Sequence, residues 1–407
     1  MTESGPLRGT WLRPAIALFI VGWGANMFVP LLDVYRGALS GVEVTGLFGA
    51  YVLGLIPALL LVAPVSDRFG RRAVLRPVVL LSAVGSLVLM LAGESFLGLL
   101  IGRIVVGVAA GAAFGPGTAW VKELSERAGR GSSGARRAAV ALTAGFAVGP
   151  LITGILTQWA PLPEHVPYLV QIALALVVAA LVWATPETVV RDASGDTQGQ
   201  TDAAPAAARP GLRPALGSRI FLAAILPTAP WVFGSASAAL AALPANVDVH
   251  GYVEVTSGVV AIVALGTGIL IQPWARALAQ RARPLPFRVG AGSAVVGLLL
   301  GAATVATHSP VLLAIAAVFL GAAYGLLLVS GLGVVEDLAP PGELATLTGI
   351  FYSATYVGFA FPLLDSLFAP IVTGPGVFVI AAAVAACAFI GLGVAWKPRR
   401  GEAQSEE

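Results

Sequence analysis

Twelve predominantly apolar stretches run through this chain, and each is long enough to form a helix that crosses a membrane. A helix of about 20 residues spans the roughly 30 Å of hydrocarbon in a bilayer. Only 11% of the residues are charged, against about 25% in a typical soluble domain, and the mean hydropathy is +0.88. The sequence therefore predicts an all-α membrane protein with spans at residues 14–33, 44–65, 73–92, 97–119, 138–158, 167–185, 220–242, 254–274, 287–306, 310–334, 344–364 and 371–396.

The spans divide into two halves of six. Residues 189–218, between the sixth and seventh spans, are rich in Ala, Pro, Gly and Asp and have little apolar surface to bury. Such a composition is typical of a flexible linker. We predict an N-terminal bundle over 1–188, a cytoplasmic linker over 189–218, and a C-terminal bundle with a cytoplasmic tail over 219–407.

The basic residues indicate the orientation. With the N-terminus inside, all of the 24 Lys and Arg except Arg36 and Arg103 fall in or beside loops on the cytoplasmic side. This bias follows the positive-inside rule. Both termini are therefore predicted to be cytoplasmic, in a protein of the cell inner (plasma) membrane. Because topology explains the basic residues, nucleic acid is not a predicted partner.

The loop after the second span carries the most specific motif. It resembles the G-x-L-x-D-R-x-G-R-R signature of the major facilitator superfamily and reads Ala63-Pro-Val-Ser-Asp67-Arg68-Phe69-Gly70-Arg71-Arg72. The resemblance implies that family's fold, two pseudo-symmetric six-helix bundles, with this loop as a cytoplasmic gate. In the family the carboxylate meets the N-terminus of the eleventh span in the outward-facing state, where a negative charge is favoured. An ordinary basic loop is the plainer alternative.

The gate prediction extends to neighbouring charges. Arg71 or Arg72 is expected to approach Glu123 or Glu126 at the end of the fourth span. We therefore assign gating to Asp67, Arg68, Gly70, Arg71, Arg72 and Glu123.

Arg103 is the only basic residue assigned inside a span. It lies in Gly102-Arg103-Ile-Val-Val-Gly107, which resembles the family's R-x-x-x-G motif of the fourth span. An arginine in hydrocarbon is costly unless it faces protein or water, so we predict that it faces the cavity, binds substrate and takes part in coupling. Its candidate partners are Asn26, a backbone carbonyl freed by a helix break, Asp33 or an anionic substrate. The alternative is a side chain that snorkels to the outer membrane surface.

The fifth span contains a motif of small residues, Gly145-Phe-Ala-Val-Gly149-Pro150-Leu-Ile-Thr153-Gly154. It resembles the antiporter signature G-x-x-x-G-P-x-x-G-G, with Thr153 in place of one Gly. In the family this motif marks exporters, so we assign Gly149 and Pro150 to gating. Generic close packing of small residues is the alternative.

Two weaker signs complete the resemblance. Pro186-Glu187-Thr188 ends the sixth span, where family members often carry a similar tripeptide, although a simple helix stop would look the same. Gln272-Pro-Trp-Ala-Arg276 occupies the equivalent of the first motif in the second half, but it lacks the Asp.

A translocation path needs polar and aromatic groups that face a cavity between the halves. The candidates lie well inside their spans, which favours the cavity over the interfacial belt where aromatic residues also gather. Besides Arg103, we predict substrate contacts from Trp23, Asn26, Met27, Tyr51, Trp231, Tyr324, Tyr352 and Tyr356.

Proton coupling is left open by the sequence. Exporters of the family often have a carboxylate in the first span before a proline, whereas here Asn26 precedes Pro30. Asp33, at the outer end of this span, is our candidate coupling residue. If it paired with Arg103, protonation would release the arginine. An ordinary hydrated carboxylate is the alternative.

The resemblance implies a secondary active transporter that exports a small amphipathic molecule, uncharged or anionic, by alternating access, with protons as a candidate coupling ion. An importer or facilitator of a small solute, and a non-transporting receptor or scaffold, are the alternatives. H-E-x-x-H, G-x-S-x-G and P-loop motifs are absent, so no enzyme activity is predicted. The lone Cys387 excludes an intrachain disulfide and a Cys-based metal site. We expect a monomer in the lipid bilayer, with no cofactor or metal and a small-molecule substrate as its partner.

Overall fold

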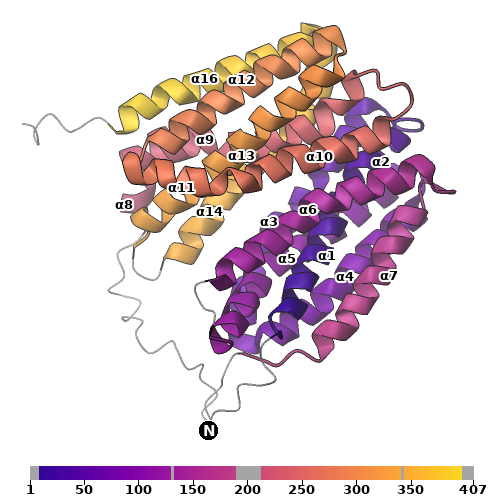
Figure 1. The fold of residues 1–407 in the computed structure, drawn as a ribbon, viewed down its shortest axis with the longest axis vertical. Helices are drawn as coiled ribbons and strands as arrows, with labels where there is room; N and C mark the ends of the chain where they lie inside the picture. The colour runs from indigo at the N-terminus through magenta and orange to yellow at the C-terminus, as the bar shows by residue number, and fades with distance from the viewer. Residues whose placement is uncertain (1–8, 130–132, 189–211, 341–342, 397–407) are drawn as a thin grey trace, which may run out of the picture.

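Twelve long apolar helices form the body of the molecule, as the sequence predicts (Figure 1). The computed structural model describes residues 9–129, 133–188, 212–340 and 343–396, and this part of the chain contains helices and no strands. The helical spans are Leu12–Tyr35, Gly41–Phe69, Arg71–Ala92, Phe96–Arg127, Gly134–Trp159, Val166–Trp183, Phe221–Ala242, Val253–Arg281, Leu285–Thr307, Pro310–Leu338, Thr346–Val372 and Gly374–Gly393. Each overlaps the predicted stretch, so the expected all-α fold in two bundles is confirmed.

The first half begins with a broken span. Pro30 has no N–H to donate to the carbonyl one helical turn before it, and the helix is interrupted at Met27. The elements of this half are α1 (Leu12–Asn26), α2 (Phe28–Tyr35), α3 (Gly41–Phe69), α4 (Arg71–Ala92), α5 (Phe96–Arg127), α6 (Gly134–Trp159) and α7 (Val166–Trp183).

The second half contains more interruptions. Its seventh, eighth and eleventh spans are each made of shorter pieces. Two prolines in the seventh span, Pro227 and Pro230, would be expected to break its helix, but both lie inside α9, and the π-helical turn η3 precedes them. The elements are α8 (Arg213–Leu216), η3 (Phe221–Ile225), α9 (Leu226–Ser237), η4 (Ala238–Ala242), η5 (Pro244–Asn246), α10 (Val253–Leu270), α11 (Gln272–Arg281), α12 (Leu285–Thr307), α13 (Pro310–Leu338), α14 (Leu344–Tyr356), η6 (Val357–Ala360), α15 (Phe361–Val372) and α16 (Gly374–Ala395).

Pairs of glycines show that the two halves are built alike. A Cβ on Gly107 or Gly111 of α5 would lie 1.9 or 2.2 Å from a carbonyl oxygen of α3. A Cβ on Gly321 or Gly325 of α13 would lie 2.1 or 2.2 Å from a carbonyl oxygen of α10. The second and fourth spans therefore cross as closely as the eighth and tenth, because only glycine lets backbones approach to this distance.

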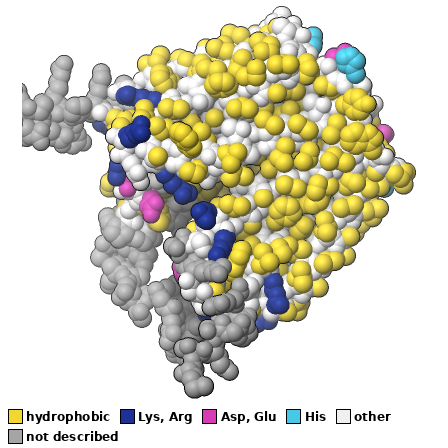
Figure 2. Space-filling model, viewed as in Figure 1, with side chains coloured by type: hydrophobic (Ala, Val, Ile, Leu, Met, Phe, Trp, Pro, Cys, Tyr) yellow, Lys and Arg dark blue, Asp and Glu magenta, His cyan; other side chains and the backbone are white. Residues whose placement is uncertain are grey.

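The two ends of the molecule differ in charge. Lys and Arg side chains gather at one end of the face in Figure 2, while hydrophobic side chains cover the flank. We call this end, which holds the loops after the even-numbered spans, the basic end. The flank exposes Leu61, Leu91, Leu270 and Ile371 by 68–77%, a surface that lipid and not water can cover. The protein is therefore a multi-pass membrane protein.

The two bundles meet at the end opposite the basic end and diverge toward the basic end (Figure 1). Most of the predicted linker, residues 189–211, lies outside the described residues, and α8 forms near its C-terminal end. The terminal residues 1–8 and 397–407 also lie outside them. The linker boundaries and the cytoplasmic location of both termini therefore stay predictions.

Candidate functional site: a central cavity between two gates

A cavity of about 800 Å³ lies between the two bundles. Helices α5 and α6 of the first half line one wall, and α9, α11, α12, α13 and α14 of the second half line the other. Its charged lining residues, Arg276, Arg283, Glu336 and Asp337, all come from the basic end of the second half, so the cavity opens there. Arg283 forms an ion pair with Asp337. A volume of this size suits a small-molecule ligand.

Aromatic rings close the inner end of this cavity. Phe233 of α9 is central, because it stacks on Tyr356 with ring centroids 4.6 Å apart. The same ring lies 5.8 Å from Tyr324 and 5.2 Å from Phe359. We call the whole set the aromatic floor: Tyr51, Phe114, Phe146, Phe233, Tyr324, Tyr352, Tyr356 and Phe359.

The aromatic floor joins the two bundles. Tyr51 of α3 meets Phe359 of η6 with ring centroids 5.1 Å apart. Phe114 of α5 lies 6.4 Å from Tyr352 of α14. The rings therefore separate the cavity from the far end of the molecule.

The structure brings the four predicted tyrosines, Tyr51, Tyr324, Tyr352 and Tyr356, into this floor. Sequence reasoning missed the four phenylalanines listed with them. A phenylalanine inside a span can equally well face lipid, as Phe368 does with 48% of its surface exposed, so the sequence holds no signal that separates the two.

The other predicted substrate contacts are placed differently. Asn26 lines a second cavity of about 30 Å³ beyond the floor and donates to the carbonyl oxygen of Phe146 at 3.3 Å. Trp23, Met27 and Trp231 line neither of these two cavities. Trp23 packs against Gly149, and Met27 is fully buried at the break in the first span. Their roles in substrate binding stay predictions.

Arg103 is sealed inside the first bundle, with 1% of its surface exposed. Its guanidinium donates to the carbonyl oxygens of Leu47, Phe48 and Ala25 at 3.0, 2.9 and 3.1 Å. Phe28 and Tyr51 present their rings to it, with centroids 4.6 and 4.9 Å away.

Of the partners considered for Arg103, backbone carbonyls are the ones found here. Ala25 lies beside the break between α1 and α2, so the arginine ties this break to α3. The side chain does not snorkel to the membrane surface, and it lines neither cavity. Its predicted contact with substrate stays a prediction.

The end opposite the basic end is closed by contacts between the bundles. Ser257 of α10 donates to Asp33 of α2 at 3.1 Å, and Asp33 also pairs with Arg36. Thr45 of α3 donates to Ser366 of α15 at 3.1 Å. Asp33 thus contacts Ser257 across the bundle interface and Arg36 beside it, and not the predicted partner Arg103; its role in coupling stays a prediction.

The small-residue motif of the fifth span helps to form this closed end. A Cβ on Gly145 would lie 2.1 Å from the carbonyl oxygen of Phe19 in α1, and a Cβ on Gly149 would lie 2.8 Å from the Cα of Trp23. A Cβ on Gly154 would lie 2.4 Å from the carbonyl oxygen of Glu254 in α10. Helix α6 therefore packs on α1 within its own bundle and on α10 across the interface.

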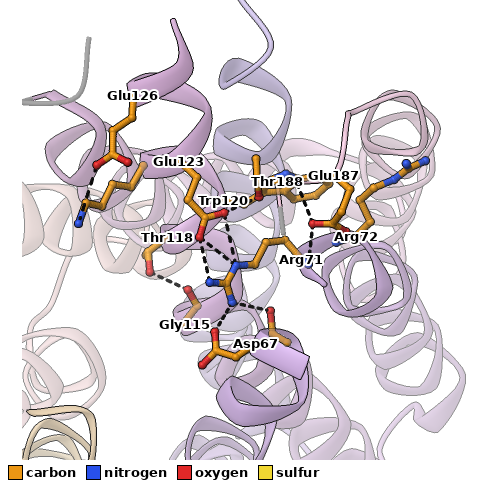
Figure 3. Close-up of polar contacts among 12 residues, drawn as sticks. Asp67, Arg71, Arg72, Gly115, Thr118, Trp120, Glu123, Glu126, Glu187 and Thr188 are labelled. Atoms are coloured by element: carbon orange, nitrogen blue, oxygen red, sulfur yellow. Dashed lines mark hydrogen bonds and ion pairs between the residues drawn. The ribbon is translucent and has the colours of Figure 1, made fainter. Parts of the chain in front are cut away.

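Of the residues assigned to the cytoplasmic gate, Asp67, Arg71, Arg72 and Glu123 lie together at the basic end (Figure 3). Arg71 donates to Asp67 at 2.5 Å and forms an ion pair with Glu123 at 2.9 Å. Arg68 lies over the ring of Phe69, 5.4 Å from its centroid. The Asp67 side chain is 62% exposed. Its expected contact with the eleventh span belongs to a state closed at the basic end and stays a prediction.

The tripeptide Pro186-Glu187-Thr188 holds this cluster together. In the sequence it was only a weak sign of the family resemblance. The Glu187 carboxylate accepts the backbone N–H groups of Arg71 at 3.1 Å and Arg72 at 3.0 Å, and so caps the N-terminus of α4. Gly70, with φ of +101°, lies against this carboxylate. Thr188 donates to Glu123, which links the cap to the ion pair (Figure 3).

Metal binding has no support in the described residues, where no three His, Cys, Asp or Glu side chains group closely enough to hold an ion. The candidate site is therefore the cavity, its aromatic floor and the two gates.

Comparisons with known proteins agree with this architecture. The profile of the Major Facilitator Superfamily matches residues 15–304 and 259–407. The structure of the nucleoside transporter NupG is 13% identical and has a TM-score of 0.70, over 97% of this chain and 100% of that one. A mutant of the same transporter, 13% identical, gives 0.73 over 95% and 100%.

A POT family transporter in complex with 5-aminolevulinic acid has a TM-score of 0.73 at 12% identity, over 96% of this chain and 98% of that one. The comparison with curated protein sequences returned no match. At such low identity the solved structures support the fold alone. Because the family profile covers nearly the whole sequence, this membrane protein belongs to the major facilitator superfamily.

Proposed function

We propose that this protein is a secondary active transporter that exports a small amphipathic molecule by alternating access, coupled to protons. The observation that carries the proposal is the cavity of about 800 Å³ between the bundles, open at one end and sealed at the other. With the basic end in the cytoplasm, this is the inward-facing state of such a cycle. The small-residue motif of the fifth span supports export as the direction.

Asp33 is the proposed coupling residue. Its carboxylate links the two bundles through Ser257 and pairs with Arg36. A proton on Asp33 would remove the charge that holds Arg36 and would weaken the closed end. Protons arriving from that side would thus favour its opening.

The test uses a compound that stabilises the purified protein in a thermal-shift screen, since binding to the folded state alone raises its stability. In everted vesicles with an acidic lumen, a proton-coupled exporter accumulates the compound against its gradient and makes the lumen less acidic. Asp33→Asn should keep binding and lose the pH change. Accumulation only in right-side-out vesicles would make the protein an importer.

A facilitator is the second candidate, because the only carboxylates among the described residues that line the two cavities are Glu336 and Asp337, which belong to the basic end. A facilitator would bring the compound to equal concentrations on both sides without a pH change. A receptor or scaffold would bind it without any flux. Either result would reject the proposed coupled exporter.

A further inference from the structure

Two tyrosine hydroxyls in the cavity have no partner in the described part of the protein. Tyr324 is 95% buried, since 5% of its surface is exposed, and it lines both cavities. Tyr352 lines the larger cavity. A phenol hydroxyl both donates and accepts hydrogen bonds. A ligand with hydrogen-bonding groups on its edge would supply partners for both hydroxyls.

The other hydroxyls of the cavity are already committed as donors. Thr118 donates to the carbonyl oxygen of Phe114 at 2.7 Å, Thr143 to that of Ala139 at 2.8 Å, and Ser330 to that of Leu326 at 2.6 Å. They can still accept a hydrogen bond. The tyrosines are therefore the hydroxyl groups that can also donate to a ligand.

The rings that carry and surround these hydroxyls favour a flat ligand. Phe114 and Phe146 come from the first half, and Phe233, Tyr324 and Tyr352 come from the second. Aromatic faces bind another ring by stacking or by edge contacts. A planar ligand placed against these rings brings its edge to the tyrosine hydroxyls.

Charge around the cavity disfavours a cation. The charged lining residues stand at the mouth and balance each other, with Arg276 and Arg283 against Glu336 and Asp337. An ion placed against the floor would lose its hydration without a counter-charge, and for a cation this cost opposes the attraction that ring faces exert on positive groups. Arg103 adds a positive charge behind the floor, 4.9 Å from the ring of Tyr51.

We propose that the substrate is an uncharged molecule with a flat aromatic ring system, held against the aromatic floor with hydrogen-bonding groups on its edge bound by Tyr324 and Tyr352. This inference rests on the proposed function and specifies its substrate class.

The experiment measures binding to the full-length protein in lipid nanodiscs, with empty nanodiscs subtracted. The probes are three naphthalenes that share one hydroxyl and differ in the second group: naphthalene-diol, hydroxynaphthoate and hydroxynaphthyl-trimethylammonium. The diol should bind saturably, and the cation should bind about tenfold more weakly or worse. Tyr324→Phe and Tyr352→Phe keep the rings and should each weaken diol binding about three- to tenfold, the range for one lost hydrogen bond.

Tyr252→Phe is the matched control, because this tyrosine is 52% exposed and lies outside both cavities. It should leave binding unchanged, and unliganded thermal unfolding confirms that the variants fold. The inference is overturned if the cation or the naphthoate binds as tightly as the diol, if both cavity variants bind like the wild type, or if the diol does not bind saturably.

The vesicle assay separates this inference from the proposed function. Flux of the trimethylammonium probe would overturn the substrate class and leave the transporter assignment standing. Binding of the diol with the expected variant pattern, but without flux of any probe, would support the site and reject the transporter assignment.

Discussion

Arg103 provides a sharp test, because the conservative substitution is expected to be the worse one. The guanidinium fork reaches three carbonyl oxygens on two different spans, those of Ala25, Leu47 and Phe48. A lysine keeps the charge but concentrates its donors on one nitrogen. Arg103→Lys therefore keeps a buried charge and loses one or two of the three hydrogen bonds.

The magnitude follows from these contacts. A hydrogen bond to a charged group contributes about 1.5–3 kcal/mol, so Arg103→Lys should lower the free energy of unfolding by about 2–5 kcal/mol. Arg103→Met also loses the bonds, but it removes the charge whose desolvation opposes folding, and such replacements are often close to neutral. We expect the Met variant to stay within about 2 kcal/mol of the wild type.

Tryptophan fluorescence during heating, in one fixed detergent, ranks the three proteins. At roughly 1–2 °C per kcal/mol for a chain of this size, the Lys variant should unfold roughly 2–10 °C below the wild type and also below the Met variant. If Arg103→Lys unfolds at the wild-type temperature, or above Arg103→Met, the argument from the fork and the buried charge is wrong. If Arg103 takes part in coupling, Arg103→Met should abolish coupled transport, and Arg103→Lys should retain only part of it, because a point charge cannot reproduce the guanidinium fork.

Three further predictions concern the gates. The first two use spin-label distances between cysteines introduced at Leu162 and His250 at the closed end, on a Cys387→Ser background, and the third uses unfolding stability. Gly154→Val should push α6 away from α10, lengthen this distance and destabilise the fold by about 1–3 kcal/mol through overpacking. Gly266→Val is the control, because a Cβ there meets nothing within 4 Å, and it should leave the distance unchanged. Equal distances in the two variants would reject the packing argument. Asp67→Asn should favour the state open at the basic end and slow transport, so unchanged flux and distances would count against it. Glu187→Ala should lower unfolding stability by about 0.5–2 kcal/mol through loss of the α4 cap, and an equal loss in Glu126→Ala, whose side chain is 49% exposed, would contradict this role.

Much of the architecture can be predicted from local sequence, because each span must bury its own backbone polar groups in lipid. Hydrophobic length alone therefore located all twelve spans, and the basic loops fixed which ends lie together. The motif Asp67-Arg68-Phe69-Gly70-Arg71-Arg72 also identified the cluster at the basic end, since its charges lie close together in the chain. The break in the first span at Met27, one turn before Pro30, was not predicted.

The composition of the site was decided by tertiary structure. Phe233 and Phe359 form the floor of the cavity because α9 and η6 cross there, while Phe368 faces outward; side-chain chemistry is the same in all three. Arg103 was identified from its charge, but its partners are carbonyls of Ala25, Leu47 and Phe48, groups that every residue carries and no sequence pattern distinguishes. Which spans pack against each other decides which of these groups meet, and that depends on contacts between residues far apart in the chain.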